Sequence, residues 1–354
     1  MRFFRGPSYA SFDARQRPAL KIPFGTMRPQ MAIFTPLSLD EARELGARFG
    51  LDVVKTRGIE AGSVNTGYEL GLQGRGRVFA RIYEEQGFDG AERETRLCSY
   101  LADHGVPTPR PIPITSGTAE GFVTAFGGKP VAMFPWIAGD MVCQRGVTEA
   151  LVASVGDALA AVHVAGLSFE NSSESRFRAE DLVARVKGIR ERASLPLDIA
   201  ALLPELSLRL TERLAARPLS VLPLVHNDLF RDNVLFEGGT LVALLDFESA
   251  SKGSPAFDLV VTMLAWCFDD ALDLSLARAL VRGYLGRRVM PEEEREELYD
   301  ASLFAALRFL ITRITDFELR PRGRGVFKDY KRFLARLRAL ESIGRRSFRD
   351  ALDV

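Results

Sequence analysis

Histidine and cysteine are scarce in this chain, which has three of each among its 354 residues. The cysteines are far apart and form no Cys-x-x-Cys pair, so neither a disulfide framework nor a zinc site is expected. A transition-metal site would need most of the three histidines, which disfavours a transition-metal enzyme. This composition fits a protein of the reducing cytoplasm.

The chain also lacks an excess charge and long apolar runs. Its 47 Lys and Arg against 46 Asp and Glu give a net charge of +1, which argues against nucleic-acid binding driven by overall charge. A local basic pocket for a small anion stays open. The apolar run Leu259–Phe268 has ten residues, too few to cross a bilayer, so no membrane partner is expected. With 47% hydrophobic residues, the chain has ample material for a buried core.

Three sequence motifs of other enzyme classes are missing. Gly-Gly-Lys-Pro at 127–130 lacks the Ser or Thr that follows the lysine of a phosphate-binding P-loop. No Gly-x-Ser-x-Gly elbow occurs, which disfavours an α/β-hydrolase. Neither Gly-x-Gly-x-x-Gly nor a βαβ unit is present to bind a dinucleotide.

Residues 1–30 form a basic segment with six basic residues, one acid and no apolar core, so they are not a secretory signal. They are either a disordered tail or an upstream extension of a chain that starts at Met27 or Met31. The second interpretation is favoured because an ordered pattern begins at Met31. Ser38 and Glu41 form a capping box, which predicts a helix up to about Phe49.

The remaining pattern predicts an α+β protein of two lobes joined near residues 134–139. Residues 31–136 read as a small antiparallel sheet with one or two helices, and residues 137–354 as a larger, mainly helical lobe. The expected strands of the first lobe are 64–70, 77–83, 121–125 and 130–135, and its second helix is 91–104. The second lobe has helices at 147–165, 180–193 and 199–215, short strands at 224–226, 233–236 and 241–247, and helices again from 256 to about 342.

The most informative segment is residues 224–250, where polar residues stand at fixed offsets between apolar strands. It contains His226-x-Asp228-x₄-Asn233, with Asp246 thirteen residues further on. Asp228, at a strand end, is placed to accept a proton from a hydroxyl, and a hairpin would bring Asp246 beside Asn233. Oxygen ligands of this kind, few in number and completed by phosphate oxygens, suit Mg²⁺. Any one of these residues alone is more often a turn cap, but the combination indicates kinase-type phosphoryl transfer.

The same segment carries a family resemblance. HNDLFRDNVLF and LLDF resemble the bacterial homoserine kinases built on the aminoglycoside/choline phosphotransferase fold. Four other segments are similar to that family, and the match runs from Met31 to about Leu337. The resemblance implies a bilobal protein-kinase-like fold with a small antiparallel β N-lobe and a larger helical C-lobe. The four segments are MAIFTPLSLDE, HGVPTPRPI, FDLVVTMLAWCF and AALRFLITRITDFELRPR.

Six residues in and around the catalytic loop have expected roles. Asp228 accepts or orients the hydroxyl proton, while Asn233 and Asp246 hold Mg²⁺. His226 braces the loop through its ring nitrogens. Arg231 either steadies the γ-phosphate of ATP or pairs with a neighbouring aspartate. Asp258 caps a helix or braces the loop.

The nucleotide site is placed partly by the residues and partly by the resemblance. The glycines of 58–67 allow backbone N–H groups to face phosphates, and Gly62, Ser63 and Asn65 belong to this loop. Glycine-rich hairpins are also simply turns. Near the joint between the lobes, Met133 and Trp136 suit an adenine slot by analogy with the fold, although apolar residues there are also ordinary core.

Arg81 occupies the position of the strand lysine that holds the α- and β-phosphates in the wider fold. Arginine is a planar fork where lysine is a point charge, so the exchange is not neutral. Glu94 on the following helix is the expected partner of Arg81, with Glu92 as its competitor.

The acceptor site needs an acid and a base, because homoserine carries an ammonium group and a carboxylate. Arg308, Arg313 and Asp316 lie in the segment most similar to the family. Arg313 and Asp316 are three residues apart and can instead form a structural salt bridge.

The predicted function is ATP-dependent phosphorylation of a small-molecule hydroxyl, and the resemblance implies L-homoserine, giving O-phospho-L-homoserine in threonine biosynthesis. Three alternatives stay open: the same chemistry on an amino alcohol, hydroxylysine or an antibiotic; a non-catalytic nucleotide-binding regulator; and a protein kinase. The short interval between Asp246 and Asp258 leaves little room for a peptide platform. We expect a cytoplasmic monomer or homodimer with no nucleic-acid partner.

Overall fold

The computed structural model describes most of the chain from residue 33 onward. Its contacts divide the sequence into two units, Met1–Gln30 and Met31–Val354. The predicted tail of residues 1–30 lies outside the described residues, as do Gly62 and Ser63 of the predicted phosphate loop. The described ranges are 33–59, 64–116, 121–170, 172–214, 222–319 and 327–353.

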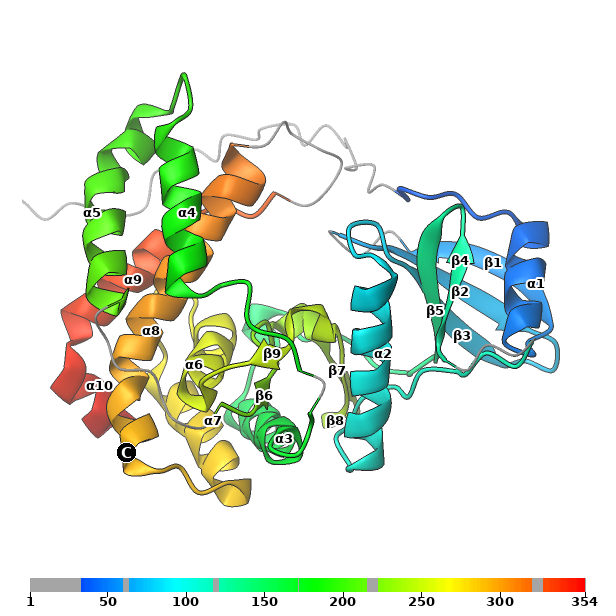
Figure 1. Cartoon of the computed structure of the whole chain (residues 1–354). Coiled ribbons are helices and arrows are strands. Elements are labelled where there is room, and N and C mark those ends of the chain that lie inside the picture. Colours follow the sequence, from blue (N-terminus) through cyan, green and yellow to red (C-terminus); the bar gives the residue numbers. More distant parts are fainter. Residues whose placement is uncertain are drawn as a thin grey trace, which may run out of the picture. The chain divides into compact units, whose positions relative to one another are not determined.

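The first half of the second unit is an antiparallel sheet with a helix on one face (Figure 1). Ser38 caps α1, and the reciprocal bond from the Ser38 backbone to Glu41 confirms the predicted capping box. The five strands have the order β1-β2-β3-β5-β4, and every neighbouring pair is antiparallel. The elements are α1 (Leu39–Arg48), β1 (Val53–Ile59), β2 (Thr66–Leu72), β3 (Arg77–Ile82), α2 (Phe88–Asp103), β4 (Val123–Phe126) and β5 (Lys129–Pro135).

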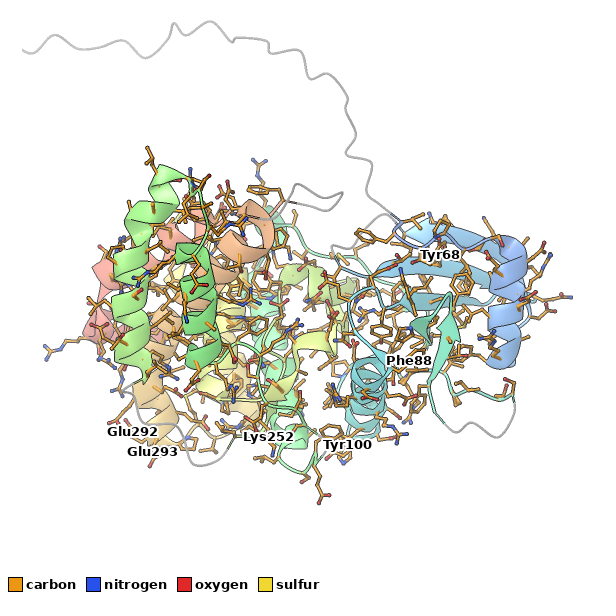
Figure 2. All side chains as sticks on the ribbon, turned by 45° about the horizontal axis from the view of Figure 1, so that its top comes forward. Tyr68, Phe88, Tyr100, Lys252, Glu292 and Glu293 are labelled. Atoms are coloured by element: carbon orange, nitrogen blue, oxygen red, sulfur yellow. The ribbon has the colours of Figure 1, made fainter. Side chains whose placement is uncertain are left out.

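The alternation of side chains along β3 sorts its residues onto the two faces of the sheet. Val78, Ala80 and Ile82 join the cluster that packs against α1, together with Tyr68 of β2, which Figure 2 labels. The Tyr68 hydroxyl donates to the Thr35 carbonyl oxygen at 2.9 Å, so this buried phenol has a partner. Arg81, between Ala80 and Ile82, therefore faces away from α1.

Strand β1 was not predicted. Its sequence Val-Val-Lys-Thr-Arg-Gly-Ile has no clean alternation of apolar and polar residues, because only Val53 is buried on this edge strand. Its pairing with β2 comes from the sheet and not from its own pattern. The predicted strands on either side of Gly71–Gly76 are confirmed as β2 and β3, and the others as β4 and β5, within a few residues.

The second half is mainly helical, as predicted, with two short two-stranded sheets. Helix α6 is apolar on all sides, and all its residues are buried. The sheets pair β6 with β9 and β7 with β8. The elements are α3 (Glu149–Gly166), α4 (Ala179–Arg190), α5 (Leu197–Leu214), β6 (Leu224–Val225), β7 (Val234–Glu237), β8 (Thr240–Leu244), β9 (Ser251–Lys252), α6 (Pro255–Trp266), α7 (Leu274–Arg287), α8 (Glu292–Arg313), α9 (Lys331–Ile343) and α10 (Arg345–Leu352), with a π-helical turn at Ile314–Glu318 and short 3₁₀ turns at Gln144–Gly146, Arg231–Asn233 and Phe247–Ser249.

Helix α3 packs closely against α7 through glycine. An added Cβ at Gly156 would overlap the Leu280 carbonyl oxygen, and one at Gly283 would overlap that of Ala153. Within the described residues, α3, predicted as the helix 147–165, is the one helix long and apolar enough to span a membrane. Half of it is buried inside the protein, as is typical of a core helix.

Candidate active site

The loop that follows β6 is anchored from below by Asp258 of α6. The buried Asp258 carboxylate accepts hydrogen bonds from the backbone N–H groups of His226, at 2.6 Å, and Asn227, at 2.7 Å. Asn227 adopts a left-handed conformation with φ of 66°, which asparagine tolerates better than most residues. Of the two roles predicted for Asp258, bracing of the loop is the one that the structure shows, because Ser254 caps α6.

A buried hydrogen-bond chain continues from Asp258 to α7. His163 Nε2 lies 3.0 Å from Asp258 Oδ2, His163 Nδ1 lies 2.7 Å from the Tyr284 hydroxyl, and Arg288 donates to that hydroxyl at 3.0 Å. Because Arg288 can only donate, the Tyr284 hydroxyl donates to Nδ1, and the Nε2 proton of His163 then points at Asp258. Burial tends to raise the pKa of Asp258, but the hydrogen bonds that its carboxylate accepts from His163 and from the His226 backbone N–H outweigh this effect, and the pKa is lowered. The carboxylate stays ionised and holds the loop.

His226 braces the loop from within, as predicted. Its Nε2 lies 3.0 Å from the Leu245 carbonyl oxygen, to which it donates, and its Nδ1 accepts from the Asp228 backbone N–H at 3.3 Å. The ring also lies 4.6 Å from the ring of Phe247. The imidazole thus ties the loop to the segment that ends β8 and leaves proton transfer to another residue.

Asp228 and Arg308 form a charged pair in the helical half of the molecule. Arg308 Nη2 lies 3.9 Å from Asp228 Oδ1, and Arg308 Nη1 donates to the Asn227 carbonyl oxygen at 2.6 Å. Burial raises the pKa of Asp228, and the charge of Arg308 opposes that rise. A carboxylate in this position is more basic than a surface aspartate, which suits a proton acceptor.

The hairpin β7–β8 brings Asp246 back beside Asn233, as the spacing predicted. Leu245 N–H donates to the Asn233 carbonyl oxygen at 2.8 Å, one residue before Asp246. The Asn233 side-chain amide donates to the Asp228 carbonyl oxygen at 2.8 Å, which leaves its side-chain oxygen as the atom suited to a cation. No three His, Cys, Asp or Glu side chains gather into a metal cluster among the described residues. An amide oxygen plus the Asp246 carboxylate nevertheless fit Mg²⁺, which takes few protein ligands beside phosphates and water.

Arg81 joins the sheet to this hairpin. Its Nη1 donates to Glu94 at 2.8 Å and to Asp246 at 3.2 Å, so Glu94 is its helix partner, and Glu92 pairs with Arg96. Burial alone would lower the pKa of Arg81, but the charges of Glu94 and Asp246 raise it well above its usual value. The guanidinium therefore stays charged between two carboxylates and lies beside the candidate metal ligand.

Asn65, from the loop before β2, contacts the residue two positions after Asp246. Its amide NH₂ donates to Glu248 at 2.9 Å, and its amide oxygen accepts from the Glu84 backbone N–H at 3.1 Å. Burial and the nearby Asp246 charge raise the pKa of Glu248. The described end of the loop that was predicted to cover phosphates thus contacts Glu248, two residues from Asp246.

Three predicted site residues, Arg231, Met133 and Trp136, make contacts within the protein that differ from those predicted. Arg231 Nη1 donates to the Ala265 carbonyl oxygen at 2.7 Å and to Gln144, so it braces the loop, and neither predicted aspartate pairing is present. The Met133 side chain is fully buried among the residues facing α1, because alternation along β5 sends it there, and not toward a base. Trp136 lies under the guanidinium of Arg77, 4.9 Å from it.

The predicted acceptor residues separate in the structure. Arg308 lies against Asp228, whereas Asp316 accepts from Arg185 of α4 at 2.8 Å. Arg313 donates to the Asp329 carbonyl oxygen at 2.9 Å and stacks over Phe333, and its burial lowers its pKa to about 10. The Arg313–Asp316 bridge that the spacing allowed is thus replaced by two other contacts.

Sequence reasoning missed four residues around the loop. His163 and Tyr284 lie on helices far from the loop in sequence, and nothing in their local pattern marks them. Asn227 and Glu248 had a signal, since each is a polar neighbour of a predicted site residue and each makes site contacts.

Comparison with known proteins agrees with this geometry. A profile of the phosphotransferase enzyme family matches residues 55–299. The chain belongs to this family. It is 32% identical over 329 residues to a homoserine kinase of Nitrobacter hamburgensis, which covers 89% of this chain and 96% of that protein. It is 33% identical over 317 residues to a homoserine kinase of Gluconacetobacter diazotrophicus, covering 87% and 96%. These matches confirm the resemblance predicted from the sequence.

Several solved structures share the fold of this chain. An amicoumacin kinase, hAmiN, in complex with AMP-PNP, Ca²⁺ and Ami has a TM-score of 0.64 at 15% identity, covering 88% of this chain and 93% of that one. A choline/ethanolamine kinase family protein from Mesorhizobium loti has a TM-score of 0.58 at 18% identity, covering 89% and 97%. The predicted protein-kinase-like fold, with an antiparallel sheet followed by a helical part, is confirmed.

Proposed function

We propose that this phosphotransferase transfers the γ-phosphoryl group of ATP to the hydroxyl of L-homoserine and forms O-phospho-L-homoserine, a step of threonine biosynthesis. The observation that carries the proposal is the loop from His226 to Asn233. In this loop the Asp228 backbone is bonded to the side chains of His226 and Asn233, and its carboxylate faces Arg308. The identity to homoserine kinases over most of the chain supports the choice of acceptor.

Asp228 is the group that handles the proton. In the reaction, the acceptor oxygen forms a bond to the γ-phosphorus, the bond from that phosphorus to the leaving oxygen of ADP breaks, and the hydroxyl proton passes to the Asp228 carboxylate. Burial raises the pKa of this carboxylate and makes it a better base, while the charge of Arg308 opposes that rise and favours the ionised form. His226 and Asp258 fix the backbone on either side, so little reorganisation is needed.

Asn233 and Asp246 would hold Mg²⁺, which supplies charge neutralisation on the phosphate oxygens when bound. Arg81 adds a fixed positive charge at the same place, through its contact with Asp246. Asn65 positions the described end of the loop that we expect to cover the phosphates, which includes Gly62 and Ser63. Glu94 keeps Arg81 in line.

We propose that the two parts of the chain have different roles. We assign nucleotide binding to residues 31–136 and catalysis with acceptor binding to residues 137–354. An enzyme of amino-acid biosynthesis with this composition belongs in the cytoplasm, as a monomer or a homodimer.

The purified protein should be tested with ATP and Mg²⁺ against a panel of hydroxyl acceptors, with ADP release as the readout. The panel contains L-homoserine, hydroxylysine, choline, ethanolamine and an aminoglycoside. We expect the highest kcat/KM with L-homoserine, and a phosphate monoester of homoserine in the ³¹P NMR spectrum. A preference for another acceptor, or no ADP release with any acceptor, would overturn the assignment.

A further inference from the structure

A cavity of about 620 Å³ adjoins the candidate active site at Glu248. Three segments line it: the start of α2 with the residues before it, the segment 173–176 that precedes α4, and residues 248–251. Its volume lies in the range of sites for small molecules.

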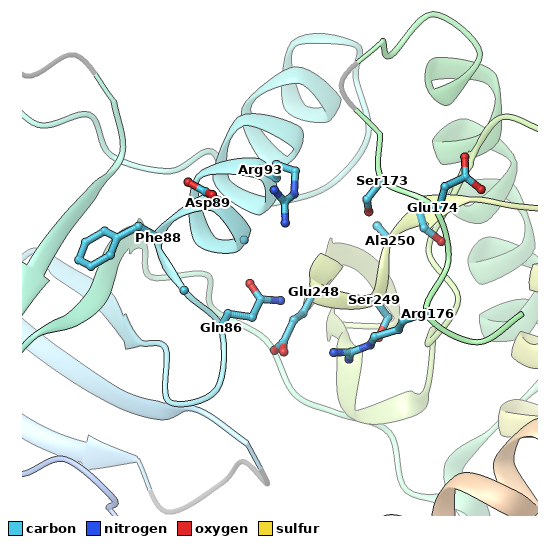
Figure 3. Close-up of a pocket in the computed structure, with 13 residues that line it drawn as sticks. Gln86, Phe88, Asp89, Arg93, Ser173, Glu174, Arg176, Glu248, Ser249 and Ala250 are labelled. Atoms are coloured by element: carbon cyan, nitrogen blue, oxygen red, sulfur yellow. The ribbon is translucent and has the colours of Figure 1, made fainter. Parts of the chain in front are cut away.

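Charges of both signs surround this cavity (Figure 3). Arg93 comes from α2 on one wall and Arg176 from the segment 173–176 on another, with the Glu248 carboxylate between the two segments. Two other acids belong to the lining: the Asp89 side chain lies on the far side of the first turn of α2, and the Glu174 carboxylate points away from Arg176 and Glu248. Two guanidinium groups and one carboxylate match a ligand with a carboxylate and an ammonium group, because arginine binds carboxylates with two parallel hydrogen bonds.

Arg176 is linked to the catalytic aspartate through its neighbour in sequence. The ring of Phe177 lies 3.9 Å from the guanidinium of Arg308, and Arg308 in turn faces Asp228. The pKa of Arg308 is lowered to about 10, mainly by burial, with the charge of Asp228 opposing the fall and that of Arg176 adding to it. The segment that carries Arg176 therefore leads directly to a contact with the pair that handles the proton.

Backbone contacts fix the position of the segment that carries Arg176. Lys252 N–H donates to the Ser173 carbonyl oxygen at 2.9 Å, and Glu174 pairs with Lys252 in a parallel bridge. The segment is thus tied to β9, which directly follows Glu248 and Ser249. Arg176 and Glu248 consequently belong to two segments that are joined by backbone contacts.

We propose that this cavity is the acceptor subsite, in which Arg176 binds the carboxylate of a short hydroxy amino acid and Glu248 receives its ammonium group. Asn65 donates to Glu248 Oε2, and Oε1 is the oxygen assigned to the ammonium group. Arg93 contributes positive charge from the opposite wall. The inference rests on the proposed function, because it assumes that the acceptor is an amino acid whose hydroxyl reaches Asp228.

The test compares two acceptors that differ in one group. L-Homoserine carries the carboxylate, and 3-aminopropan-1-ol is the same molecule without it. For Arg176→Gln we expect kcat/KM with L-homoserine to fall about 10- to 100-fold, as for the loss of a charged hydrogen-bond partner. The KM for ATP and the kcat/KM for 3-aminopropan-1-ol should not change. Arg176→Lys, which keeps the charge, should lose less.

Arg178→Gln is the matched control. Arg178 lies two residues further along the chain, pairs with Asp181 at the start of α4, and does not line the cavity. This variant should keep wild-type values for both acceptors. If Arg176→Gln keeps the wild-type kcat/KM for L-homoserine, or loses equally on both acceptors, Arg176 does not bind the carboxylate and only this inference fails. If the wild-type protein does not phosphorylate L-homoserine at all, the proposed function fails, and the inference fails with it.

Discussion

The partly buried Asp228 and the buried Arg308 are groups of opposite charge, and each affects the ionisation of the other. Removing the positive charge by Arg308→Gln should raise the pKa of Asp228 further, because the ionised carboxylate loses its stabilising partner. The acidic limb of the profile of kcat/KM against pH should then move to higher pH. Arg308→Lys keeps a charge there and should leave the limb nearer its wild-type position.

The profile should be measured with L-homoserine and saturating ATP for the wild type and both variants. Arg308 also donates to the Asn227 carbonyl oxygen, so a uniform loss of activity in both variants is expected from the loop alone. An acidic limb that does not move in an active Arg308→Gln protein would show that Asp228 does not titrate in the reaction.

At the scale of residues, the sequence predicts the groups that stand in one short motif and misses those brought in from far away. His226, Asp228, Asn233 and Asp246 fall within one loop and hairpin, so their spacing determines their neighbours. The contact of Arg81 with Glu94 was also predicted, because one strand and the next helix place them together. The pairing of Arg231 with a neighbouring aspartate was not found, because its partners, among them the Ala265 carbonyl oxygen, come from other elements.

The close contact of α3 with α7 depends on glycine in both helices. Gly283→Ala should lower the free energy of unfolding by about 1–3 kcal/mol, because the added methyl group overlaps the Ala153 carbonyl oxygen and forces the helices apart. Gly286→Ala, in the same helix, is the control. Its added methyl group meets nothing within 4 Å, so stability should stay equal or rise by up to about 1 kcal/mol. Urea unfolding measures both, and equal stability of the two variants would contradict the packing argument.

The chain from α7 to the catalytic loop predicts a functional effect at a distance. In Tyr284→Phe, His163 Nδ1 loses its donor, so the ring is held only by its bond to Asp258 and is free to shift from the position in which it donates there. We expect kcat to fall about 10-fold, with little change in either KM, and a loss of stability of about 1 kcal/mol.

Tyr299→Phe provides the comparison for this prediction. The Tyr299 hydroxyl is a buried donor to the Leu340 carbonyl oxygen at 3.3 Å, remote from the loop. Its removal should cost similar stability and leave kcat unchanged. If both variants keep the wild-type kcat, the chain serves stability and does not position the loop.

Elements were predictable where their own pattern decides them. Helix α1 carries its capping box, and α6 is an apolar run interrupted only by Asp258 and Thr262, so both can be recognised in the sequence. Strand β1 cannot be recognised in this way, because polar side chains stand on both of its faces. Only its pairing with β2 makes it a strand. Helix α3 was placed correctly, but its contact with α7 depends on glycines that look neutral in a sequence.

At the scale of the whole molecule, the active site costs stability. The raised pKa of Asp228 means that the folded protein prefers the neutral acid, even with the attraction to Arg308 included. The contribution of this group to stability is fully present below the unfolded pKa, about 3.9. It is lost as pH rises through the higher folded value, because ionisation then opposes folding. At neutral pH the protein therefore retains a charge that favours unfolding.

Asp228→Asn replaces the charged group by a neutral one of the same shape, so it should raise the Tm at pH 7.5 while abolishing turnover. The gain should shrink as the pH falls through the raised pKa of the folded state, below which the wild-type carboxyl is also neutral. Thermal unfolding at several pH values measures it. Asp232→Asn, an exposed position in the same loop, should change the Tm little at any pH. If Asp228→Asn has the same Tm as the wild type at pH 7.5, or a lower one, burial does not penalise this carboxylate, and the explanation of its basicity falls with it.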